Sequence, residues 1–151
     1  MKKILISLFY LFFPLLIGSI VGFITSSSID YNSLIKPLFS PPSFLFPIIW
    51  SIIYLLLGIS YFILKKNNKD TPRIRKLYYF QLFVNALWSI IFFSLKWRFF
   101  AIIWILLLDV LVIAMVSLFF ERDKKVGYLN IPYVIWSIFA TYLTIGIYIL
   151  N

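Results

Sequence analysis

Five long apolar segments, separated by short polar ones, constrain this chain more than any other feature of its sequence. They cover about residues 4–24, 44–64, 77–95, 99–120 and 128–150. Each is close to the roughly 20 residues that an α-helix needs to cross a bilayer. Because irregular backbone and open sheet edges are not tolerated in lipid, each segment is predicted to be a transmembrane helix. The sequence therefore predicts an all-α integral membrane protein, with residues 1–151 forming a single five-helix domain.

Composition supports this class and excludes several kinds of chemistry. The chain is 63% hydrophobic and only 13% charged, whereas about a quarter of the residues in soluble domains are charged. Cysteine and histidine are both absent. This absence excludes disulfides, thiolate nucleophiles, histidine-ligated metals and Ser-His relays. We therefore predict no metal site and no required cofactor, and a conventional catalytic constellation is not expected.

The basic residues predict the orientation of the five spans. Eleven of the 14 lysines and arginines fall on one side, within residues 2–3, 65–76 and 122–125. By the positive-inside rule the N-terminus is cytoplasmic, and loop 25–43 and the C-terminus are external. The net charge of +9 is thereby explained by topology and by contact with anionic lipid head groups, without a nucleic-acid partner. Enrichment in Ile, Phe, Tyr and Lys favours an AT-rich bacterial source, and thus a multi-pass protein of a bacterial cell membrane.

The longest polar segment is also rich in proline. Residues 25–43 read TSSSIDYNSLIKPLFSPPS, and a further proline, Pro47, follows at the start of the second span. Proline fixes its own backbone torsion and lowers the entropy cost of ordering a loop. Pro47 falls in the first helical turn, where a missing N–H is tolerated. The segment is predicted to be a stiff loop that caps the bundle.

Three spans carry aromatic stripes at helical spacing. The stripes are Phe46, Trp50 and Tyr54; Gln81, Asn85, Trp88 and Phe92; and Tyr133, Trp136, Ala140 and Thr144. Bundle packing or interfacial aromatic belts would explain tryptophans alone. Amides such as Asn85 are costly in lipid, however, and tend to face a partner or a cavity. Flat aromatic walls with a few polar groups predict a pocket for a large planar hydrophobic molecule.

Two further features leave alternatives open. Gly18 and Gly22 form a GxxxG motif, which permits close helix packing either within one chain or in a dimer. Asp109 is the one carboxylate within a predicted span. It would be the proton carrier in the alternative function, that of a small proton-coupled transporter. The competing interpretation is a polar contact between helices, because no second ionisable group lies at similar depth to pass a proton on.

Three segments resemble a known family. The first contains Tyr31, Leu34, Lys36-Pro37, Pro41-Pro42, Phe46, Trp50 and Tyr54. The second, QLFVNALWSIIFF, covers residues 81–93, and the third, GYLNIPYVIWSIFATYL, covers residues 127–143. In order and spacing they resemble the motifs of the translocator protein family, also called tryptophan-rich sensory proteins (TspO) or peripheral benzodiazepine receptors. The resemblance covers essentially the whole chain.

The resemblance implies a five-helix bundle, often a homodimer, with a pocket beneath the loop that joins helices one and two. Family members bind porphyrins such as protoporphyrin IX, and some are described as degrading porphyrin in light and oxygen. The resemblance therefore implies porphyrin sensing, sequestration, transport or photo-oxidative degradation, with Trp50 and Trp136 implicated if degradation occurs. Carried over by motif position, the ligand-binding residues are Tyr31, Pro41, Phe46, Trp50, Asn85, Trp88, Trp136 and Ala140, and the stripe of the third span adds Phe92.

The chain departs from the family pattern at a few positions. Phe39 and Phe44 stand where the family commonly has tryptophan, which keeps the aromatic surface but removes two indole N–H donors. Thr144 stands where the family usually has asparagine, and no basic residue follows it. A cholesterol-recognition motif requires such a residue, which argues against sterol binding.

Overall fold

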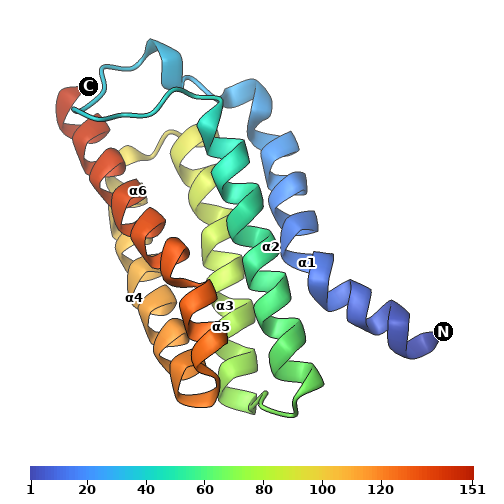
Figure 1. Cartoon of the computed structure of the whole chain (residues 1–151). Coiled ribbons are helices and arrows are strands. Elements are labelled where there is room, and N and C mark those ends of the chain that lie inside the picture. Colours follow the sequence, from blue (N-terminus) through green and yellow to red (C-terminus); the bar gives the residue numbers. More distant parts are fainter.

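The computed structural model describes all of residues 1–151 and is entirely helical (Figure 1). Its α-helices are α1 (Lys2–Thr25), α2 (Leu45–Lys66), α3 (Pro72–Ser89), α4 (Arg98–Arg122), α5 (Lys124–Leu129) and α6 (Ile131–Leu150). Two short 3₁₀ turns, η1 (Ser26–Ser28) and η2 (Tyr31–Ser33), lie in the loop after α1, and a π-helical turn, η3 (Ile90–Ser94), extends α3. Five helical stretches are long and apolar enough to cross a membrane, which confirms the predicted fold class.

Successive spans run in opposite directions, so the connections gather at two ends of the bundle (Figure 1). We call one the lid end, because residues 26–44 cover it. The opposite end, where the N-terminus, the α2–α3 turn and the α4–α5 turn lie, is called the basic end. The three basic groups counted in the sequence all fall at the basic end. The protein is therefore a multi-pass membrane protein with a strongly asymmetric charge distribution.

Two spans are less regular than their hydropathy predicts. The third helix begins at Pro72, before the predicted span 77–95, because the Thr71 side chain accepts a hydrogen bond from the Ile74 N–H (3.2 Å). The fifth span, predicted as 128–150, begins at Lys124 and is interrupted at Asn130. The Asn130 amide donates to Ser60 Oγ (2.7 Å) and to the Val126 carbonyl (2.9 Å). These buried bonds fix the junction between α5 and α6 against α2.

Helix α1 packs on α2 through two glycines. A Cβ added at Gly58 would lie 1.9 Å from the Leu11 carbonyl oxygen, so the two backbones touch there. A Cβ at Gly18 would lie 2.2 Å from the Tyr54 ring, whereas one at Gly22 would meet nothing within 4 Å. Of the two GxxxG glycines, only Gly18 makes a close contact within the monomer.

The loop of residues 26–44, which we call the lid, is fixed mainly to α6 and to the α3–α4 connection. The Asn151 side chain bonds both the N–H and the carbonyl of Ile35 (3.0 and 2.8 Å). The Tyr142 hydroxyl donates to the Leu38 carbonyl (2.8 Å). Arg98 forms an ion pair with Asp30 (2.7 Å). These contacts hold the predicted cap over the bundle.

Candidate functional site

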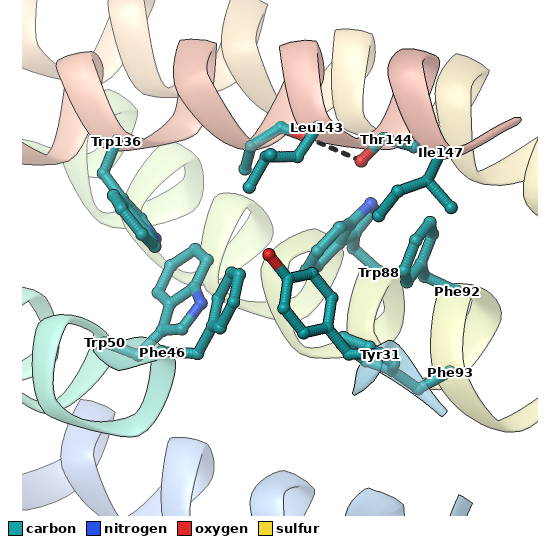
Figure 2. Close-up of a pocket in the computed structure, with 11 residues that line it drawn as sticks. Tyr31, Phe46, Trp50, Trp88, Phe92, Phe93, Trp136, Leu143, Thr144 and Ile147 are labelled. Atoms are coloured by element: carbon teal, nitrogen blue, oxygen red, sulfur yellow. Dashed lines mark hydrogen bonds between the residues drawn. The ribbon is translucent and has the colours of Figure 1, made fainter. Parts of the chain in front are cut away.

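The three predicted stripes converge at the lid end, where they enclose a narrow aromatic slot (Figure 2). Helix α2 contributes one wall, α3 and η3 a second, and α6 the third. The slot is lined by Tyr31, Phe46, Trp50, Trp88, Phe92, Phe93, Trp136, Ala140, Leu143, Thr144 and Ile147. Its volume is only 10 Å³, so in this conformation the side chains nearly fill it.

Four aromatic rings of the slot, those of Tyr31, Phe46, Trp50 and Trp136, meet edge to face, whereas Trp88 and Phe92 stack with their planes at 17°. Tyr31 descends from the lid onto Phe46, with ring centroids 4.9 Å apart and planes at 72°. Trp136 meets Phe46 at 5.8 Å and Trp50 at 6.4 Å, again nearly perpendicular. Edge-to-face pairs are favourable, yet they leave ring faces free, so a flat molecule could replace these contacts with stacking.

A second and larger compartment adjoins the slot on the α1 side. It has a volume of 370 Å³ and shares Tyr31, Phe46, Trp50, Trp88 and Phe93 with the slot. The remaining lining residues are largely small or hydroxyl-bearing: Leu15, Gly18, Ser19, Val21, Gly22, Thr25, Ile29, Ser43, Pro47, Ser51, Tyr54 and Ser89. We call it the α1 chamber. Its volume lies within the range of pockets that hold small organic ligands, roughly 300–1,000 Å³.

Two indole donors in the slot have no partner. Trp88 is 5% exposed, and its Nε1 is buried without a hydrogen bond, as is Nε1 of Trp136. A buried unpaired donor costs free energy unless something supplies an acceptor. In contrast, Nε1 of Trp104, which lies outside the slot, donates to the Val84 carbonyl (2.8 Å). The free donors are therefore specific to the slot, and a ligand with acceptor groups would satisfy them.

A buried hydrogen-bond network lies behind the aromatic walls. The Tyr54 hydroxyl donates to Asn85 Oδ1 (2.7 Å), and the Asn85 amide donates to the Tyr133 hydroxyl (2.6 Å). Tyr133 in turn donates to Gln81 Oε1 (2.7 Å). Trp50 stacks on Tyr54 at 5.7 Å. The network joins α2, α3 and α6, and it fixes the tyrosine against which Trp50 rests.

Seven of the nine residues predicted to bind ligand line the slot, and Asn85 and Pro41 do not. Asn85 belongs to the network behind the wall, where it orients Tyr54 and Tyr133. Pro41 lies in the lid, and its carbonyl accepts a hydrogen bond from the Tyr31 hydroxyl (2.8 Å). Burial raises the pKa of that hydroxyl above its usual range, so it remains a neutral donor. The ligand contacts of all nine residues stay predictions.

Charged groups border the slot at its lid end without lining it. The guanidinium of Arg98 lies over the Phe92 ring, 4.5 Å from its centroid. Its Nη2 binds Asp30, while Nη1 is buried without a partner. Lys96 lies 3.6 Å from the same carboxylate. This end of the slot is therefore suited to a ligand that carries negative charge at its edge.

Asp109 lies away from both compartments. Its carboxylate accepts a hydrogen bond from the Thr141 hydroxyl (2.5 Å) at the contact between α4 and α6, and its Oδ1 has no partner. No other ionisable side chain lines the slot or the α1 chamber except tyrosines. A polar helix contact accounts for this arrangement, and proton carriage by Asp109 stays a prediction.

Sequence patterns alone missed Phe93 and the contribution of α1. Phe93 directly follows Phe92, and adjacent residues of an ordinary helix face different directions. The π-helical turn at Ile90–Ser94 widens the helix at this point, and both rings contact the slot. On α1, Gly18 and Gly22 carry no side chain that could form a stripe. Their motif was a usable signal of close packing, but it did not indicate a cavity.

Comparisons with known proteins match this architecture along its length. The profile of the TspO/MBR family matches residues 10–150. The tryptophan-rich protein TspO of Archaeoglobus fulgidus is 35% identical over 140 residues, which cover 91% of each chain. The chain belongs to the TspO/MBR family. A second relative, the tryptophan-rich protein TspO of Bacillus cereus, is 32% identical over 158 aligned positions that cover 100% of this chain and 99% of that one.

Protein CrtK of Rhodobacter capsulatus is also similar, at 35% identity over 86% of this chain and 83% of its own. Membership of the TspO/MBR family confirms the resemblance that was inferred from the three sequence motifs. It also agrees with the five membrane-spanning helices. The slot and the α1 chamber are thus pockets of a TspO/MBR family bundle.

Proposed function

We propose that this protein binds tetrapyrroles of the protoporphyrin IX class at the lid end, in the combined slot and α1 chamber. The observation that carries the proposal is the pair of buried, unpaired indole donors of Trp88 and Trp136 within an otherwise apolar aromatic slot. A porphyrin offers a flat apolar ring for the aromatic faces and carboxylates at its edge. Arg98 and Lys96 supply positive charge at the lid end for those carboxylates.

The volumes of the two compartments limit the route by which a macrocycle could enter. The 370 Å³ chamber admits a small organic ligand, whereas the 10 Å³ slot does not. A macrocycle would therefore enter the α1 chamber first and separate Tyr31 and Phe46, which form part of the boundary between the two spaces. Rotation of these side chains costs the edge-to-face contacts, and stacking on the ligand replaces them. Sensing, sequestration and transport all require this binding step.

Titration with protoporphyrin IX, followed by quenching of tryptophan fluorescence, tests the proposal. We expect saturable quenching for the wild type and an affinity about tenfold weaker when Trp50→Phe and Trp136→Phe are combined, because indole contacts contribute roughly 0.5–1.5 kcal/mol each. Trp97→Phe is the matched control, since Trp97 is 58% exposed and lies outside both compartments. Equal affinity for the double variant and the wild type would refute the assigned site.

Light-dependent degradation is a second candidate, favoured by the pairing of Trp50 with Trp136 at the slot. In such a reaction dioxygen is the oxidant and the macrocycle is oxidised. A tryptophan that passes one electron to dioxygen, which becomes superoxide, and then takes one electron from the porphyrin would carry the oxidising equivalent. Porphyrin absorbance followed under illumination, in air and under nitrogen, separates a binder from a degrader. Bleaching that is equally fast with Trp50→Phe and Trp136→Phe would exclude these side chains from turnover.

A further inference from the structure

A groove with lysines at its mouth separates α1 from α2 at the basic end. Pro14 lies inside α1, and proline is a common cause of helix bending. The N-terminal half of α1 diverges from α2 below the contact between Gly58 and Leu11 (Figure 1). The resulting space comprises two adjoining cavities of 340 and 270 Å³ that share Lys3, Ser7 and Phe62.

The groove is polar at one end and apolar at the other. Three lysines, Lys3, Lys65 and Lys66, line the cavity at the mouth. The deeper cavity is lined by the apolar side chains Ile4, Leu8, Leu11 and Phe62, together with Lys3 and Ser7. From Lys3 to Leu11 the helix rises roughly 12 Å, close to the thickness of one hydrocarbon leaflet. The groove therefore runs from the membrane interface into the bilayer and ends where the two helices touch.

The charge at the mouth is only partly neutralised within the protein. Lys65 binds Asp70 (2.7 Å) and lies over the Tyr10 ring. Lys3 and Lys66 make no salt bridge with any carboxylate. The groove itself is lined by no acidic residue. A ligand that matches it carries a negative head group and an apolar chain.

We infer that this groove is a binding site for one anionic phospholipid, with the phosphate at Lys3 and Lys66 and an acyl chain against Leu8, Leu11 and Phe62. The position of the site in the bilayer selects a lipid over a soluble phosphate, because the apolar half of the groove opens onto hydrocarbon. The site lies on the opposite end of the bundle from the aromatic slot, and it does not depend on porphyrin binding.

Native mass spectrometry of the full chain, released from bilayers of mixed phosphatidylglycerol and phosphatidylcholine, tests the inference. We expect the wild type to retain one phosphatidylglycerol in preference to phosphatidylcholine. Combining Lys3→Gln with Lys66→Gln is expected to weaken that binding roughly thirtyfold, since each lysine near an anionic membrane contributes about one kilocalorie per mole. The matched control combines Lys124→Gln with Lys125→Gln, which removes the same charge from the same end but outside the groove.

A second variant separates the groove from its charge. Ser7→Phe fills the space shared by the two cavities without changing any charge, and it is expected to displace the lipid. Three results would overturn the inference. The first is equal retention of the two lipids by the wild type. The second is a loss of phosphatidylglycerol binding in the Lys124/Lys125 control as large as in the Lys3/Lys66 variant. The third is displacement of the lipid by glycerol phosphate, which would indicate a soluble phosphate ligand.

Discussion

The two ends of the bundle both contain clusters of aromatic side chains, but one cluster is packed and the other is hollow. At the basic end, Tyr61 stacks on Tyr78 with centroids 4.3 Å apart and planes at 11°, and the rings of Tyr10 and Tyr79 pack against them with centroids 5.3 to 5.8 Å away. We call this group the tyrosine cluster. At the lid end, Tyr31, Phe46, Trp50 and Trp136 meet edge to face, and Trp88 stacks on Phe92, around the slot and the α1 chamber.

The two clusters differ because different contacts set the spacing of the helices around them. At the tyrosine cluster, Tyr61 and Tyr78 stack face to face, and Tyr10 and Tyr79 pack edge to face around them between α1, α2 and α3. Of these four rings only Tyr10 borders the groove between α1 and α2. At the lid end, the π-helical turn widens α3. Beyond Ser26, whose hydroxyl donates to the Phe23 carbonyl of α1, the lid is fixed to α6 and Arg98. Similar aromatic content thus stabilises the fold at one end and leaves room at the other. The comparison predicts that stability and ligand binding depend on different ends of the molecule.

The largest expected effect is on stability, at the tyrosine cluster. Tyr78→Ala removes a ring that is 1% exposed and stacked on Tyr61. Deleting a buried aromatic ring leaves a cavity, and we expect the free energy of unfolding to fall by about 3 kcal/mol. Trp136→Ala should cost about 1 kcal/mol while it weakens porphyrin binding, because Trp136 is only half-buried and less packing is lost with its ring. Unfolding in detergent, followed by circular dichroism, measures both. An equal loss of unfolding free energy in the two variants would mean that the slot is packed like the rest of the core.

The two glycines of α1 give a sharper test with a smaller effect. In Gly18→Ala the new methyl group would lie 2.2 Å from the Tyr54 ring, which is held by Asn85 and by stacking on Trp50. Overpacking of this kind costs roughly 1–3 kcal/mol, and the melting temperature should fall accordingly. Gly22→Ala meets open space in the α1 chamber, so we expect no loss and a small gain from helix propensity.

The same pair also tests the predicted homodimer. Within one chain, only Gly18 makes a close contact. A melting temperature that fell as much for Gly22→Ala as for Gly18→Ala would contradict the hollow chamber, and it would place Gly22 against a second copy of the chain. Size-exclusion chromatography with light scattering on both variants would then show whether the oligomeric state changes with the stability.

Helical periodicity was sufficient to predict the five spans and the inward faces of three of them. Gln81, Trp88 and Tyr133 are all buried, as their spacing predicts, because amides such as Gln81 and Asn85 are costly in lipid and turn the helix face that carries them inward. The lid was predictable from its prolines. These features depend on local sequence and on the constraints of the bilayer, so they can be predicted without knowing which helices contact one another.

Features that depend on contacts between distant segments could not be predicted. The role of Asn85 in the network depends on hydroxyls from α2 and α6, and the break at Asn130 depends on Ser60 of α2. The tyrosine cluster draws on three helices, so no single stripe predicts it. Its signals in the sequence were Tyr61, seven residues after Tyr54, and Tyr78, three residues before Gln81. The α1 chamber is defined by small residues, and a missing side chain leaves no hydrophobic pattern to detect.

The smallest expected effect concerns the ion pairs that border the tyrosine cluster. The Asp70 side chain is 5% exposed and contacts Lys65 (2.7 Å) and Arg75 (2.8 Å). Burial raises the pKa of the Asp70 carboxyl, but hydrogen bonds and charges from Lys65 and Arg75 outweigh it, so that pKa lies below its ordinary value. A carboxyl with a lowered pKa in the folded state stabilises the fold above its unfolded pKa, about 3.9, and loses that contribution as pH falls through the folded value.

Asp70→Asn should therefore lower the free energy of unfolding at pH 7 by about 1 kcal/mol or less, the range of partly exposed ion pairs. The loss should shrink below pH of about 4, where the wild-type carboxyl gains its proton. Glu121→Gln is the control, since Glu121 is exposed, makes no salt bridge and lies at the same end. The difference in free energy of unfolding between Asp70→Asn and the wild type could instead persist unchanged into acid. That result would mean that hydrogen bonding, and not charge, holds the α2–α3 turn beside the tyrosine cluster.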